Sequence, residues 1–189
     1  MAVQGGGLLE RAASQLLVVD IQVKLIPTIH AVEAMVARAR FVIDAASALG
    51  VPITLTEQYP KGLGHTVPGL AAEIGNAPVF EKLAFSCWKD QPLKKHMIAH
   101  HEAGRPLVIL AGIESHVCVM QTAADLSAAG FGVFAVADAM ASRAPSSHAL
   151  ALERMRQHGV AVVNTEMVVF ELLGKAGTAE FKALSALVR

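Results

Sequence analysis

The fold is decided by the stretch Leu107-Val108-Ile109-Leu110-Ala111-Gly112-Ile113-Glu114-Ser115-His116-Val117-Cys118. Its apolar first half has the length and composition of a buried strand, and the glycine and polar residues that follow predict a sharp turn. Cys118 then falls where the next helix should begin, and the positive end of a helix dipole favours the thiolate, the reactive form of cysteine. We therefore interpret Cys118 as a candidate nucleophile. The alternative, a small apolar residue that packs a helix against a sheet, stays open.

The whole chain alternates short apolar runs with helix-period segments, which is typical of a parallel sheet covered by helices on both faces. This pattern predicts an α/β fold of three layers, α/β/α, around a mainly parallel six-stranded sheet. The expected strands cover residues 15–20, 51–56, 78–82, 107–112, 132–137 and 160–163. The expected helices cover residues 28–49, 90–101, 116–129, 147–158, 165–173 and 179–187. Residues 57–69 contain three glycines and two prolines and are expected to form a long irregular loop.

Length and composition argue against several classes of function and predict the domain organisation. A chain of 189 residues predicts one domain, residues 1–189, of which residues 1–13 are expected to fray. The balance of 16 basic and 16 acidic residues argues against a nucleic-acid partner, and apolar runs of strand length argue against a membrane span. The 53% hydrophobic content favours a homo-oligomer, a dimer or a tetramer. The N-terminal residues lack a secretory pattern, so a cytoplasmic protein with reduced cysteines is expected.

Polar side chains follow three of the expected strands. Asp20 comes after an apolar run, Lys82 ends another strand, and Cys118 lies beyond a third. Because the carboxyl ends of parallel strands meet at one edge of the sheet, these groups can supply a base, a cation and a nucleophile to one site. The alternatives are that Asp20 only caps a helix and that Lys82 only pairs with Glu81 or Asp20 in solvent.

Four motifs follow one another along the chain. They are Val19-Asp20-Ile21-Gln22, then Thr56-Glu57-Gln58-Tyr59-Pro60-Lys61-Gly62-Leu63-Gly64, then Phe80-Glu81-Lys82 with Phe85-Ser86-Cys87, and last Gly112-Ile113-Glu114-Ser115-His116-Val117-Cys118. In order and spacing they resemble the isochorismatase-like cysteine hydrolases over residues 16–173. The loop motif is most similar to the branch that includes the isochorismatase-domain-containing proteins.

The resemblance implies a catalytic triad of Asp20, Lys82 and Cys118 and an acyl-thioester intermediate that water hydrolyses. It also implies a cis peptide bond between Ile113 and Glu114, with the backbone N–H groups of Glu114 and Cys118 forming an oxyanion hole. The family members that cleave isochorismate itself lack the cysteine. Cys118 therefore points to an amide, carbamoyl or ester substrate of small size.

The chain departs from the nicotinamidases of the family, which carry an Asp-x-His metal motif after the second strand. Here the corresponding stretch is Glu57-Gln58-Tyr59, and only His65 lies nearby. The resemblance therefore implies no metal and no cofactor. His96 and His100 have a spacing that can bind a metal on a helix, but a polar helix face is the better interpretation because no third ligand is evident.

Four further residues adjoin the triad motifs and are candidates for substrate binding. They are Gln22, Tyr59, Phe85 and His116. The alternative for each is structural packing or loop hydrogen bonding. Glu57 is expected to be able to pair with Lys82.

Two other functions stay open beside metal-independent cysteine hydrolysis. The chain could be a non-catalytic oligomeric binding or scaffold protein of the same fold. It could instead be a redox-sensing thiol protein, in which case Cys87 is the only cysteine that could resolve an oxidised Cys118.

Overall fold

The computed structural model describes residues 7–72 and 74–186 and contains one six-stranded sheet in the order β3-β2-β1-β4-β5-β6. Every pair of neighbouring strands is parallel, so the expected sheet is confirmed and is parallel throughout. The strands are β1 (Ser14–Val19), β2 (Ile53–Gln58), β3 (Val79–Lys82), β4 (Leu107–Ile113), β5 (Gly132–Ala141) and β6 (Ala161–Val163).

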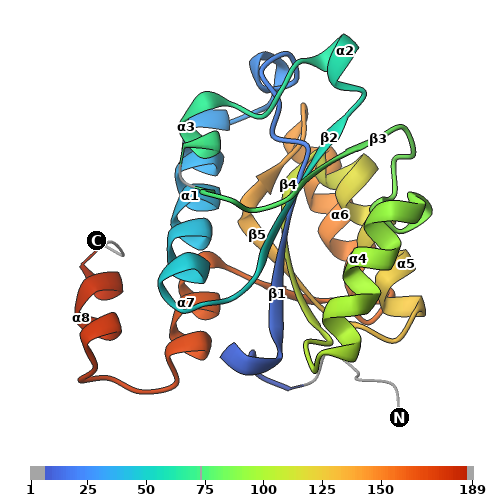
Figure 1. Cartoon of the computed structure of the whole chain (residues 1–189). Helices are drawn as coiled ribbons and strands as arrows, with labels where there is room; N and C mark the ends of the chain where they lie inside the picture. Colours follow the sequence, from blue (N-terminus) through green and yellow to red (C-terminus); the bar gives the residue numbers. More distant parts are fainter. Residues whose placement is uncertain (1–6, 73, 187–189) are drawn as a thin grey trace.

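Helices cover both faces of the sheet, as Figure 1 shows. The longer ones are α1 (Val32–Ala48), α4 (Gln91–Glu102), α5 (Met120–Ala128), α6 (Pro145–Gln157), α7 (Thr165–Leu173) and α8 (Ala179–Ser185). Leu16 and Val18 of β1 pack into the core on the α1 and α7 side. Leu17 and Val19 pack into the second core, on the side of α4, α5 and α6. Because successive side chains of a strand point to opposite faces, one continuous apolar strand supplies both cores.

From β1 the chain adds β2 and β3 on one side of the sheet and then returns to add β4, β5 and β6 on the other side. Open α/β sheets bind their ligands at such a switch point, which here lies between β1 and β4. Val19 of β1 lies opposite Gly112 of β4 in the strand register. Gly112 has φ +118°, and a Cβ atom there would lie 2.0 Å from the Val19 carbonyl oxygen. Only glycine therefore allows the two strands to approach each other this closely beside the polar residues that follow them.

The connection after β2 is shorter and more regular than expected. β2 extends to Gln58, and the following segment contains two short helices, α2 (Pro60–Leu63) and α3 (Pro68–Ala71). The prediction of an irregular loop was wrong here because each proline occupies the first position of a helix, where its fixed φ is favourable and its missing N–H costs nothing.

Two other boundaries differ from expectation. α1 begins at Val32 rather than at residue 28, because Ala31 before it has a left-handed backbone, φ +50°, which separates it from a short 3-10 turn. The N-terminal segment does not fray throughout: Leu9 is buried and donates its N–H to Glu171, 2.8 Å away. The expected fraying of residues 1–6 and the expected helix end at residue 187 lie outside the described residues.

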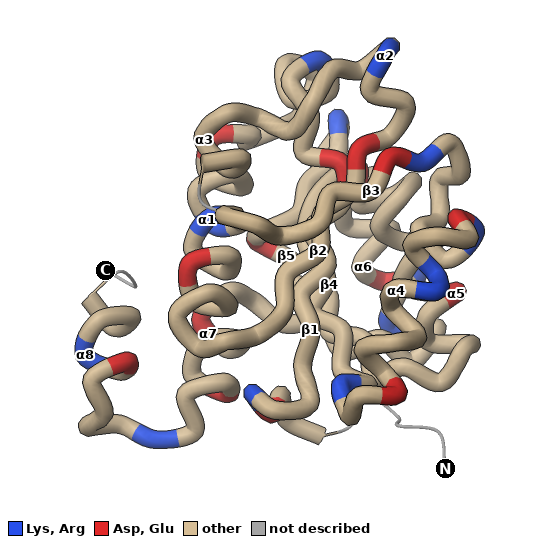
Figure 2. Tube along the Cα trace, viewed as in Figure 1, with Lys and Arg blue, Asp and Glu red and all other residues tan. Residues whose placement is uncertain are grey.

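Charged residues of both signs are interspersed along the chain trace (Figure 2). No helix among residues 7–72 and 74–186 is long and apolar enough to cross a bilayer.

Candidate active site

The centre of the site is a buried ion pair between two residues at the carboxyl edge of the sheet. Asp20 follows β1 directly, and Lys82 is the last residue of β3. The Lys82 Nζ atom lies 2.6 Å from Asp20 Oδ2, and both side chains are fully buried. Since an unpaired charge at this depth would cost several kcal/mol, each residue requires the other. The solvent-exposed pairing that the sequence left open for Lys82 does not occur.

Both ends of this ion pair are held by further hydrogen bonds. Thr56 of β2 donates its hydroxyl to Asp20 Oδ1 at 2.7 Å, so each carboxylate oxygen has one donor. Lys82 also donates to Gln58 Oε1 at 2.9 Å and to the carbonyl of Phe85 at 3.2 Å. The carboxylate and the ammonium therefore each have a fixed orientation.

The groups around Lys82 determine the direction in which its pKa is shifted. Burial by itself would lower the pKa of its ammonium, but the nearby Asp20 carboxylate and the thiols of Cys87 and Cys118 together raise that pKa above its ordinary value. Lys82 therefore stays a cation throughout the physiological pH range.

Cys118 lies in the turn that joins β4 to α5. Ser115–Val119 form a π-helical turn, in which the Val119 N–H bonds to the Glu114 carbonyl at 3.2 Å, and α5 begins only at Met120. The residue is 7% exposed. The sequence predicted a helix over residues 116–129, and the structure confirms its extent but replaces its first turn by this wider one.

The expectation that the helix terminus favours the thiolate was wrong. Burial raises the pKa of the Cys118 thiol above its ordinary value, and the Asp20 carboxylate raises it further, while Lys82 opposes both. In the resting protein Cys118 is therefore a neutral thiol beside a carboxylate. The Asp20 carboxylate is the adjacent group that can accept the thiol proton.

Cys87, the second thiol, is also part of this cluster. It is fully buried and lies 4.0 Å from the Thr56 hydroxyl. Burial raises the pKa of Cys87 to about 11, although Lys82 counteracts this effect. Cys87 is therefore shielded from solvent and protonated at neutral pH.

The peptide bond between Ile113 and Glu114 is cis, as the family resemblance implied. Glu114 accepts a hydrogen bond from Arg143, with 2.9 Å between Nε and Oε2. Its carbonyl accepts the N–H groups of Val117 and Val119, the neighbours of Cys118 on either side.

Two of the four candidate binding residues make hydrogen bonds within the protein. Gln22 is fully buried; its amide donates to the carbonyls of Gln58 and Gly64 and accepts the Gln58 N–H, which is the structural alternative that the sequence left open. His116 is half-buried, and its Nδ1 lies 2.9 Å from the Ser142 hydroxyl.

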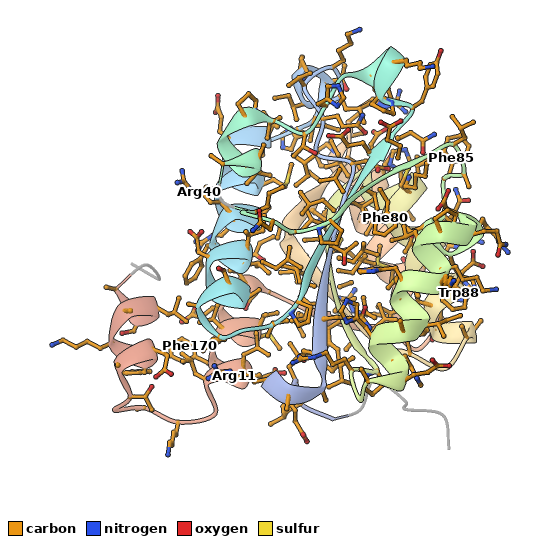
Figure 3. All side chains as sticks on the ribbon, in the orientation of Figure 1. Arg11, Arg40, Phe80, Phe85, Trp88 and Phe170 are labelled. Atoms are coloured by element: carbon orange, nitrogen blue, oxygen red, sulfur yellow. The ribbon has the colours of Figure 1, made fainter. Side chains whose placement is uncertain are left out.

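The other two are exposed. Tyr59 is 52% exposed and Phe85 is 55% exposed. Phe85 lies beyond the end of β3 (Figure 3). Tyr59 and Lys82 contribute to a cavity of about 550 Å³ at the outer edge of β3. The residues that line this cavity do not include Asp20, Phe85 or Cys118, and the role of Tyr59 and Phe85 in binding stays a prediction.

Glu57 does not pair with Lys82 as expected. Its carboxylate accepts the Thr66 N–H at 2.6 Å and lies 2.9 Å from His65 Nδ1. Burial raises the pKa of Glu57, but the Thr66 and His65 contacts lower it more, so the net direction is downward. Glu57 therefore anchors the segment after α2 to the end of β2.

Potential metal ligands are not gathered anywhere in residues 7–72 and 74–186 in a group of three or more histidine, cysteine or acidic residues. His96 and His100 stack edge to face with ring centres 4.7 Å apart, and His96 Nε2 lies 3.0 Å from the Thr54 hydroxyl. The His96 ring also lies 5.0 Å from the Phe80 ring, so it packs between α4 and the sheet.

Sequence reasoning missed Thr56 and Gln58, which contact the buried ion pair, and Ser142 and His148, which contact the turn of Cys118. Thr56 could have been identified as a polar residue within a strand, β2, that is largely buried. The partners of the turn are 26 and 33 residues distant in sequence, where no spacing pattern points to them.

Comparisons with known proteins agree with this geometry. A model of the isochorismatase domain matches residues 14–167. The chain is 41% identical over 187 residues to isochorismatase domain-containing protein 2 of Danio rerio, a match that covers 97% of this chain and 91% of that protein.

Solved structures with this fold include the MAR1 ribonuclease of Caenorhabditis elegans, with a TM-score of 0.89 and 36% identity over 96% of this chain and 92% of that one. The YcaC gene product of Escherichia coli, described as an octameric hydrolase of unknown specificity, has a TM-score of 0.88 and 25% identity over 95% of this chain and 90% of that one. With a matching domain model over most of its length and close relatives over nearly all of it, the chain belongs to the isochorismatase family.

Proposed function

We propose that this protein is a metal-independent cysteine hydrolase that cleaves a small amide, carbamoyl or ester bond through an acyl-thioester on Cys118. Membership of the isochorismatase family and its hydrolase-like structural neighbours support a hydrolase. The observation that carries the finer proposal is the fully buried pair of Asp20 and Lys82 beside the nearly buried Cys118 thiol. A scaffold protein has no use for a buried ion pair at this position, since apolar residues of similar size are often as stabilising.

In the proposed reaction, Asp20 takes the thiol proton as Cys118 Sγ bonds to the substrate carbonyl carbon. The N–H groups of Glu114 and Cys118 receive the oxyanion, and Lys82 keeps the charge of the site balanced while Asp20 is protonated. The proton then passes to the leaving amine or alkoxide as its bond to carbon breaks. Water attacks the thioester, Asp20 takes its proton, and the acid leaves as the thiol is re-formed.

The redox alternative is less well supported. Disulfide formation would require Cys87 to attack an oxidised Cys118, but Cys87 is fully buried and its pKa is about 11. A thiol in that state is a slow resolving partner.

Nucleic acid is not our proposed substrate, although the Caenorhabditis elegans relative is described as a ribonuclease. The 16 basic and 16 acidic residues leave no net positive charge to attract a polyanion.

We also propose that the protein is a cytoplasmic homo-oligomer whose subunits have one domain each. The octameric YcaC structure and exposed apolar side chains such as Leu83 and Leu150 support the assembly, and the two free cysteines suit a reducing compartment.

A substrate panel tests the proposed function. Small amides, ureido acids and esters are incubated with the wild-type protein and with Cys118→Ala, and the release of ammonia or acid is measured. We expect at least one class to be hydrolysed by the wild type alone. Hydrolysis that Cys118→Ala performs equally well would rule the proposal out.

The pH dependence of thiol alkylation tests the interaction between Asp20 and Cys118. Iodoacetamide reacts with the thiolate, so its rate rises through the pKa of Cys118. Because the Asp20 carboxylate raises that pKa, Asp20→Asn should move the midpoint of the alkylation profile to lower pH, even though it removes the base and abolishes hydrolysis. The modified peptide is identified by mass spectrometry. A midpoint that stays in place or moves upward would contradict this account of the site.

A further inference from the structure

The turn that carries Cys118 is attached to one distant segment by three side-chain contacts in a row. Glu114 pairs with Arg143, Ser115 with His148, and His116 with Ser142. We call residues 114–119 the nucleophile turn and residues 142–148 the clamp segment. The clamp segment begins just after β5 ends at Ala141 and reaches into α6, so the next strand–helix unit of the sheet supplies it.

From this arrangement we propose that the clamp segment positions the nucleophile: its contacts to the nucleophile turn keep the Cys118 thiol against Asp20. The proposal deepens the proposed function and rests on it for the catalytic role of Cys118. None of the clamp residues is proposed to touch substrate, so each is a positioning residue.

The central contact is the one between Ser115 and His148. The Ser115 hydroxyl is fully buried and lies 2.9 Å from His148 Nδ1. Burial lowers the pKa of His148, which favours the neutral imidazole, and a neutral Nδ1 can accept a hydrogen bond from the serine hydroxyl. Removing the imidazole would leave a buried hydroxyl without this partner, which costs more than the hydrogen bond alone contributes.

The other two contacts lie on either side of it in sequence. His116 Nδ1 and the Ser142 hydroxyl are 2.9 Å apart, and Ser142 is buried. Arg143 Nε donates to Glu114 Oε2 at 2.9 Å, with the arginine exposed and the glutamate nearly buried. Three consecutive residues held in this way cannot shift independently, and Cys118 follows the last of them by two positions.

The packing around the clamp segment is incomplete on one side. Ser142, Pro145 and His148 border a cavity of about 240 Å³ that is also lined by Met35 and Met140. Where side chains face a cavity, van der Waals contacts are fewer, and the polar contacts make the larger contribution to position. Their loss should therefore move the nucleophile turn rather than be absorbed by the core.

The test compares Ser115→Ala, His148→Ala and the double variant with a matched control. His96→Ala removes an imidazole that lies 3.0 Å from the Thr54 hydroxyl, a pair of the same chemistry between α4 and β2 that includes no residue of the nucleophile turn or the clamp segment. Each variant is measured by urea unfolding, by the pH profile of Cys118 alkylation, and by kcat and KM on the substrate that the panel identifies.

We expect the clamp variants to move the alkylation midpoint to lower pH, because a displaced thiol loses both causes of its raised pKa, burial and Asp20. These variants should lower kcat by about 10- to 100-fold with little change in KM, because moving a reacting group such as the thiol by about 1 Å can have that effect. The double variant should be no slower than the worse single one, and His148→Asn should recover part of kcat. His96→Ala should change stability alone.

Arg143→Ala changes an exposed side chain, so this variant should fold and allows the measurement to be repeated. The midpoint of its alkylation profile should also move to lower pH, by less than in Ser115→Ala and His148→Ala. The proposal is overturned if the midpoints and kcat values of the clamp variants match those of His96→Ala, or if the effects of Ser115→Ala and His148→Ala simply multiply. Failure of the proposed function looks different. In that case Cys118→Ala keeps its activity, whatever the alkylation profiles show.

Discussion

Cys118→Ala should reduce hydrolysis of the panel substrate by on the order of 10⁴-fold or more, because removal of the nucleophile eliminates the covalent route. Cys118→Ser should be nearly as inactive, since the serine hydroxyl is a much weaker acid than a thiol and Asp20 cannot take its proton as readily. Initial rates of product release, measured with wild-type and variant proteins at equal concentration, give the comparison.

The control for this prediction is Cys87→Ser. Cys87 is more deeply buried than Cys118 and also lies near Lys82, but it is not assigned a role in the reaction. The Cys87 variant should retain most of the activity, and all three variants should unfold cooperatively in urea. Loss of activity in Cys87→Ser, with Cys118→Ala still active, would reverse the assignment of the nucleophile.

Lys82→Met should destabilise the protein by about 3–5 kcal/mol, the usual cost of leaving one partner of a buried ion pair alone. The methionine fills a similar volume, but the Asp20 carboxylate loses its 2.6 Å charged partner and keeps the neutral Thr56 hydroxyl as a donor. Urea unfolding at pH 7, followed by circular dichroism, measures the change.

The double variant Asp20→Asn/Lys82→Met separates charge from packing. It has no unpaired buried charge, so it should be more stable than Lys82→Met alone even though it carries two substitutions. Both variants should lack hydrolytic activity. A double variant that is less stable than either single one would show that shape, and not charge pairing, holds this region together.

The sheet and its carboxyl-edge residues could be predicted because the information is local. Continuous apolar runs such as the one ending at Ile113 are long enough for a buried strand, and polar residues directly after them must lie at the sheet edge. These patterns predict that Asp20, Lys82 and Cys118 lie at one edge of the sheet. The short helices after β2 were missed because Pro60 and Pro68 serve equally well as helix starts and as loop residues.

The electrostatics of the site could not be predicted in the same way. The direction of the Cys118 pKa depends on how deeply the thiol is buried and on its proximity to Asp20, and neither can be read from a helix start in the sequence. The same holds for the contact between Ser115 and His148, which joins two elements 33 residues apart. Sequence patterns of helices and strands identify the elements, whereas these contacts depend on how the elements pack.

The most direct test of the central claim is to trap the intermediate on Cys118. A substrate from the panel, or a small activated ester, is mixed with the protein, the reaction is quenched with acid within its first turnover, and the peptides are analysed by mass spectrometry. Our account predicts the mass of the acyl group on the peptide that contains Cys118, in wild type and not in Cys118→Ala. Turnover without this adduct, together with unchanged hydrolysis by Cys118→Ala, would contradict it.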